Sequence, residues 1–195
     1  MKAILISFCF CFSSCQVLLS TILGVEEPVA KNDVEIAHNL RNRYPSYPLY
    51  RVKENKMDSL LRAEYKTGWG PGFRPIQFIC FNNKGKLVTQ WASCESGQNS
   101  YTLKEFPPRS KYPSNPEFDI KKVIDIVKPL SPDNANLNTY ENYEYTYVVY
   151  VTSWTDKLSS DLVESIKKYA ASNKYTYNIV LVSADYYKTP SSLKN

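Results

Sequence analysis

Apolar and polar positions follow their clearest pattern between residues 145 and 185. Residues 145–152 form an uncharged run of aromatic and β-branched side chains, which predicts a central strand covered on both faces. From Leu158 the apolar residues recur every three or four positions and the lysines come late, so we expect an amphipathic helix that ends near Asn173. A second apolar run at residues 177–184 completes a parallel βαβ unit.

Polar groups at the ends of these two strands are the first candidates for chemistry. In parallel sheets, active groups gather where the strands end, and here those ends are residues 153–157 and 185–187. The acids Asp156, Asp161 and Asp185 lie near strand or helix ends and could pair in a hydrolase. Helix capping and solvation explain these three acids better.

The remaining pattern predicts further elements of an α/β domain. Two strand patterns, at residues 76–81 and 86–91, flank a glycine-containing turn and predict an antiparallel hairpin. We also expect a brief strand at residues 49–52 and a helix at residues 117–128. Residues 131–142 are interpreted as a polar linker that leads back to the βαβ unit.

The N-terminal segment predicts export from the cytoplasm. After Lys2, residues 3–25 carry no charge. Residues 12–15 read Phe-Ser-Ser-Cys and resemble the lipobox of bacterial lipoproteins, in which Cys15 would be lipidated. Cleavage near Gly24 and an uncut membrane anchor remain as alternatives. In all three cases the bulk of the chain lies outside the cytoplasm and close to a membrane, at the periplasmic or cell-surface side.

These features suggest one folded domain behind a leader. Residues 1–24 are assigned to the leader or anchor, residues 25–44 to a tether, residues 45–187 to a single domain, and residues 188–195 to a tail. Within the tether, residues 34–40 are amphipathic and form either a short helix or part of a free connection.

Charge and residue types exclude several classes of function. The formal net charge is +5, and most of the excess lies between residues 39 and 75. We interpret this stretch as a solvated basic surface, so no nucleic-acid partner is expected. His38 is the single histidine, which removes nearly every metal site and catalytic triad that needs imidazoles. No metal or cofactor is therefore expected.

Two cysteines, Cys80 and Cys94, follow the leader. A disulfide between them is possible outside the cytoplasm. However, a hairpin that turns near Lys84 would place Val88 opposite Cys80, and Cys94 would lie about 20 Å further along a straight strand. The alternative is a buried Cys80 and a Cys94 in a loop.

In this order the elements resemble a thioredoxin fold, a three-layer α/β sandwich with a mixed central sheet, cut and rejoined. Residues 49–127 resemble the second half of that fold: a strand, a short helix after Asn55, the sequence Phe-Arg-Pro at residues 73–75, the hairpin and a helix. Residues 145–185 resemble its first half, the βαβ unit that carries the redox motif. The resemblance implies one of two arrangements. Either the chain is a circular permutation of that fold, or residues 49–52 take the place of a strand of the family that the second apolar run also resembles.

The chain departs from that family at the redox motif. After Trp154, the positions equivalent to the motif are Thr155, Asp156, Lys157 and Leu158, without a thiol. Val149 stands where the resemblance places a buried, proton-shuttling carboxylate in catalytic members. The resemblance therefore excludes dithiol chemistry at this site and implies a binding or structural module.

Two functions follow from these observations. The first is a non-catalytic, membrane-tethered module that binds a protein or peptide partner beside the proline that this family usually holds in the cis form. Its expected contact residues are Trp69, Arg74, Pro75, Trp154 and Thr155. The second is an extracytoplasmic thiol-dependent oxidoreductase that uses Cys94 or Cys80, although Glu95 beside Cys94 would raise rather than lower the pKa of that thiol.

Overall fold

The computed structural model describes residues 29, 31–56, 76–92, 119–130 and 137–185. They form an α/β structure around a mixed sheet of six strands in the order β3-β2-β5-β6-β1-β4. The strands are β1 (Leu49–Val52), β2 (Gln77–Asn82), β3 (Leu87–Ala92), β4 (Val127–Pro129), β5 (Tyr145–Val151) and β6 (Tyr177–Ser183). The helices are α2 (Asp33–Arg43), α5 (Ile120–Ile126) and α6 (Asp156–Ser172), with 3-10 turns η1 (Leu137–Asn142) and η2 (Ser153–Thr155).

The βαβ unit predicted between residues 145 and 185 is confirmed. Strand β5 pairs in parallel with β6, from Tyr145 opposite Tyr177 to Val151 opposite Ser183, and α6 connects the two strands. Because β5 also pairs with β2 on its other edge, it is a central strand, and every residue after its first is buried. Asn173 caps the C-terminus of α6, as expected.

The sheet is completed on both sides of this unit. The predicted hairpin of β2 and β3 is confirmed and lies antiparallel to β5. On the other side, β1 pairs in parallel with β6, and β4 pairs antiparallel with β1. Residues 49–52 therefore form a strand of their own, β1, which extends the sheet beside β6, the strand of the second apolar run.

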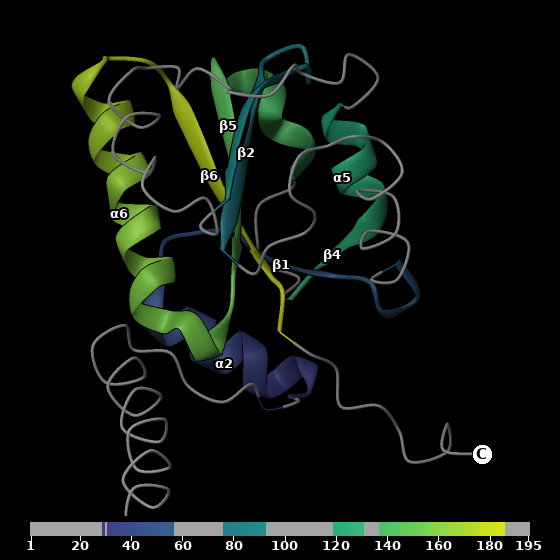
Figure 1. Ribbon diagram of the computed structural model, residues 1–195. Coiled ribbons are helices and arrows are strands. Elements are labelled where there is room, and N and C mark those ends of the chain that lie inside the picture. The colour runs from purple at the N-terminus through teal and green to yellow at the C-terminus, as the bar shows by residue number, and fades with distance from the viewer. Residues whose placement is uncertain (1–28, 30, 57–75, 93–118, 131–136, 186–195) are drawn as a thin grey trace, which may run out of the picture.

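Helices cover both faces of the sheet, α6 on one side and α5 on the other (Figure 1). On the first face, α2 and α6 pack on β2, β5 and β6. This core includes Ile36 and Leu40 of α2, Leu162 and Ile166 of α6, and the strand residues Phe78, Cys80, Tyr147, Val149 and Leu181. On the second face, α5 and η1 pack on Tyr50, Val52, Ile79, Phe81, Val148, Tyr150, Val180 and Val182. Alternate residues of each strand thus enter opposite cores, as the two-residue period of a strand requires.

Helix α2 forms part of the core. Ile36 and Leu40 are fully buried, so the helical alternative for residues 34–40 is the one observed. Asn32 and Glu35 form a capping box that satisfies the first free N–H groups of the helix. The segment assigned to a tether, residues 25–44, is therefore packed against the sheet from Asp33 onward.

The structure corrects two local predictions. The helix expected over residues 117–128 is shorter, since Asp119 caps α5 through the backbone N–H groups of Lys121 and Lys122, and Val127 already belongs to β4. Pro129 is tolerated there because β4 is an edge strand, where the missing N–H costs no ladder bond. The expected linker over residues 131–142 ends in η1, where Leu137 and Tyr140 are buried against α5 and the sheet.

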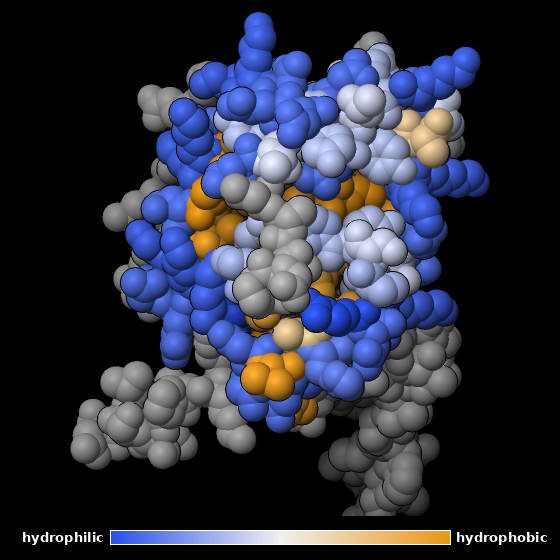
Figure 2. All heavy atoms as spheres, turned by 180° about the vertical axis from the view of Figure 1, so that it is seen from behind, coloured by the Kyte–Doolittle hydropathy of each residue, from blue (hydrophilic) through white to orange (hydrophobic). Residues whose placement is uncertain are grey.

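The surface is mainly hydrophilic on the side opposite to the view of Figure 1, with apolar side chains visible in the middle of that face and at its lower end (Figure 2). Among the described residues, the large hydrophobic side chains that are exposed are Val29, Val34 and Tyr175. No helix within the described residues is long and apolar enough to cross a membrane.

Replacement of Gly85 by Ala is expected to lower the free energy of unfolding by about 2–3 kcal/mol. Gly85 has a φ of +72° in the hairpin turn, and a Cβ atom there would lie 2.9 Å from Cγ2 of Ile120. Urea unfolding followed by circular dichroism measures the loss. The exposed neighbour is the control, because Lys84→Ala should change stability by less than about 0.5 kcal/mol. Equal effects of the two substitutions would contradict this account of the turn.

Candidate functional site

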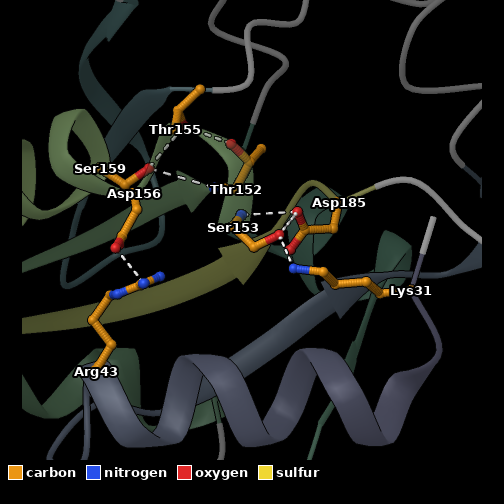
Figure 3. Close-up of polar contacts among 8 residues, drawn as sticks. All are labelled: Lys31, Arg43, Thr152, Ser153, Thr155, Asp156, Ser159 and Asp185. Atoms are coloured by element: carbon orange, nitrogen blue, oxygen red, sulfur yellow. Dashed lines mark hydrogen bonds and ion pairs between the residues drawn. The ribbon is translucent and has the colours of Figure 1, made fainter. Parts of the chain in front are cut away.

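The carboxyl ends of β5 and β6 form the candidate site. The two strands are parallel, so their ends meet at one edge of the sheet. Thr152, Ser153 and η2 follow β5, and Asp185 follows β6 (Figure 3). Helix α2 lies against this edge, where Arg43 forms an ion pair with Asp156 at the start of α6.

Asp185 holds the ends of the two strands together. It is almost fully buried. Its Oδ1 accepts hydrogen bonds from the backbone N–H and from Oγ of Ser153, each at 2.8 Å, and its Oδ2 accepts one from Oγ of Ser183 at 3.0 Å. Three donors therefore satisfy this buried carboxylate, as a charge removed from water requires.

Lys31 extends this contact to the segment before α2. Its Nζ donates a hydrogen bond to Oγ of Ser153 at 2.8 Å, so that Lys31, Ser153 and Asp185 form a chain (Figure 3). A serine nucleophile needs a neighbouring base that accepts its proton. Here Lys31 donates to the hydroxyl, and the carboxylate that accepts from it is already engaged by two other donors. The contacts of this chain fix the positions of the Lys31 and Ser153 side chains.

Three side chains with hydroxyl groups lie just before α6 and within its first turn. Oγ1 of Thr155 contacts Oγ1 of Thr152 at 2.5 Å and Oγ of Ser159 at 3.2 Å. All three residues are buried. Thr155, the first of the four positions that the resemblance aligns with the redox motif, therefore belongs to a buried set of hydroxyl contacts.

An open pocket of about 470 Å³ adjoins this edge of the sheet. It is lined by Lys31, by Asn39, Asn42 and Arg43 of α2, and by Ser153. On α2 the three lining residues are spaced i, i+3 and i+4, which places them on one face of the helix. Nδ2 of Asn42 also donates to Nε2 of His38 at 3.1 Å. His38 is exposed and does not line the pocket itself.

The structure brings together only part of the contact surface expected from the sequence. Trp154 and Thr155 lie at the site, but Thr155 is buried and Trp154 is partly exposed. Trp69, Arg74 and Pro75, like Cys15, lie outside the described residues. The pocket residues before Ser153 were missed because they belong to the segment assigned to a tether. The one available signal was the amphipathic pattern of residues 34–40.

Cys80 is a free thiol in the core between the sheet and helices α2 and α6. Burial raises its pKa, while a hydrogen bond with Tyr147 acts in the opposite direction. A reactive cysteine needs an exposed thiolate, so Cys80 serves packing. The strand register places Thr89 opposite Cys80, one residue from the position expected. Cys94 lies outside the described residues.

In the described part of the chain, no group of three or more histidine, cysteine, aspartate or glutamate side chains could hold a metal ion. Val149, which the resemblance aligns with a buried carboxylate, is fully buried among apolar side chains.

Comparison with protein families, with curated proteins and with solved structures finds no match for this chain.

Proposed function

We propose that the protein is a non-catalytic binding module with a rearranged thioredoxin-like fold, tethered outside the cytoplasm by its N-terminal segment. Its partner, a protein or a peptide, binds at the carboxyl ends of β5 and β6, beside Trp154 and over the neighbouring pocket. The observation that carries this proposal is the polar pocket at a strand-end edge whose buried groups are positioned by hydrogen bonds and include no thiol.

The sheet supports the thioredoxin-like part of the proposal. The βαβ unit and the hairpin share one mixed sheet, with β2 of the hairpin against β5 of the unit. The hairpin comes before the βαβ unit in the chain, as a circular permutation of the family's order requires. Strands β1 and β4 extend this sheet beyond β6.

The leader supports the tether. The uncharged run over residues 3–25 and the cysteine at position 15 favour an exported chain that is held at a membrane. In that setting the membrane is one partner, and the strand-end site faces the second.

A pair of photo-crosslinking variants tests the binding site on the full-length protein in the cells that express it. A photoreactive residue replaces Asn42, which is exposed at the pocket, or Asn83, which is exposed in the hairpin turn. The turn lies at the opposite end of the sheet, because Asn82 pairs with Tyr145 at the start of β5. We expect a discrete crosslinked partner from position 42 and none from position 83. No product at position 42, or the same products at both positions, would reject the site.

A further inference from the structure

The described side chains that line the pocket all carry N–H or O–H groups, and of these the hydroxyl of Ser153 already donates to Asp185. Two of them are cationic, Lys31 and Arg43, two are amides, Asn39 and Asn42, and one is a hydroxyl, Ser153. No acidic side chain is among the described residues that line it. Such a lining repels cations and suits a group with several acceptor atoms and a negative charge.

The two cations reach the pocket from opposite ends of α2. Figure 3 shows Lys31, which precedes the helix, and Arg43, its last residue, both directed toward the ends of the strands. Among the described residues, Nζ of Lys31 donates to Oγ of Ser153 at 2.8 Å, and Arg43 forms its ion pair with Asp156. An ammonium group has three donors and a guanidinium group has five, so both retain donors for a ligand after these contacts.

Two carboxylates lie near these cations and reduce the positive charge that a ligand meets, but neither is among the described residues of the lining. Asp185 is buried behind Ser153 and is satisfied by three donors. Asp156 forms the ion pair with Arg43 and is not among the described residues that line the pocket. The 17-residue helix α6 begins just after Ser153, so the positive end of its dipole adds to the field at this edge.

We infer that the pocket binds an oxyanion, a carboxylate or a phosphate group, carried by the partner. This inference rests on the proposed binding function and names the chemistry that the partner presents. The volume of about 470 Å³ exceeds that of a single anion and lies in the range of ligand pockets, so the oxyanion enters together with the part of the partner that carries it.

Titration with inorganic phosphate and with acetate tests this inference. Binding to the full-length protein is followed by amide chemical shifts, with chloride at matched ionic strength as the reference. We expect millimolar affinity for at least one anion and a loss of about tenfold, or about 1.4 kcal/mol, in Lys31→Gln and again in Arg43→Gln. Lys84→Gln is the matched control, because it removes the same charge at the exposed hairpin turn. Circular dichroism verifies that each variant is folded.

The outcomes distinguish the two chemical sources of the anion. They also show whether a failure concerns the anion chemistry or the binding site itself. Preference for phosphate identifies a phosphorylated group, and preference for acetate identifies a carboxylate. Either one supports the inference. Absence of binding for both anions, or equal weakening by Lys84→Gln and Lys31→Gln, overturns it. If crosslinking from position 42 persists in that case, only the anion chemistry is wrong. If crosslinking is also absent, the binding site itself is wrong.

Discussion

Raising the pH from about 8 to about 11 is expected to lower the free energy of unfolding by about 5 kcal/mol. Burial raises the pKa of the Cys80 thiol and of the Tyr147 phenol well above their usual range, and it raises the pKa of Tyr44 to about 12. In the unfolded chain the thiol ionises near about pH 8.5 and the phenols near about pH 10. The folded protein therefore keeps protons that the unfolded chain releases, so stability is complete below about pH 8.5 and falls as the pH rises.

Urea unfolding at a series of pH values measures this loss. Cys80→Ala should remove the part of the slope that begins at about pH 8.5, and Tyr147→Phe should reduce the slope above about pH 10, each by up to about 1.4 kcal/mol per pH unit. Such a loss is comparable to the whole stability of many domains, so we expect unfolding without denaturant near the upper limit. A flat pH profile, or an unchanged slope in both variants, would contradict the account.

Asp33→Asn is expected to lower the free energy of unfolding by about 3 kcal/mol. Arg51 of β1 is only 1% exposed, and its guanidinium forms an ion pair with the carboxylate of Asp33 at the start of α2. The same carboxylate accepts from Nζ of Lys128 in β4 at 2.6 Å. The substitution removes the negative charge that faces a buried cation and also loosens α2 from the sheet.

Two further variants show whether the buried charge is responsible. The exposed pair of Lys56 and Asp125, at 3.7 Å, provides the matched control, since Asp125→Asn should cost less than about 1 kcal/mol. The double variant Asp33→Asn with Arg51→Met should recover most of the loss, because an apolar side chain needs no counterion in the core. If Asp33→Asn costs no more than Asp125→Asn, the ion pair does not anchor α2.

The local pattern of apolar and polar residues was sufficient to predict the elements in which that pattern is long or marked by a turn residue. Strands β5 and β6 and helix α6 were predictable because each repeats apolar residues over seven or more positions. The hairpin was predictable because Gly85 supplies the positive φ that its turn needs. Strand β4 has three residues and η1 has six, too few to show a period, and both depend on neighbours that are distant in sequence.

The site depended on packing far more than the elements did. Ser153 and Asp185 could be expected near one another, since parallel strands end at one edge. Lys31 is 122 positions from Ser153, and nothing in its local sequence distinguishes it from other lysines that precede a helix. The pocket exists because Ile36 and Leu40 are buried against the sheet, which fixes the polar face of α2 opposite the strand ends.

By itself, the sequence determined the α/β class, the central βαβ unit, the hairpin and the absence of thiols at the start of α6, because these follow from residue type and short-range period. Only the tertiary structure decided that α2 belongs to the core, that Arg51 is neutralised by Asp33, and that Lys31 and Arg43 converge on Ser153. Each of these contacts joins segments that are distant in the chain. Their geometry is set by the way apolar faces are buried, and the sequence pattern alone is compatible with many alternative arrangements of those faces.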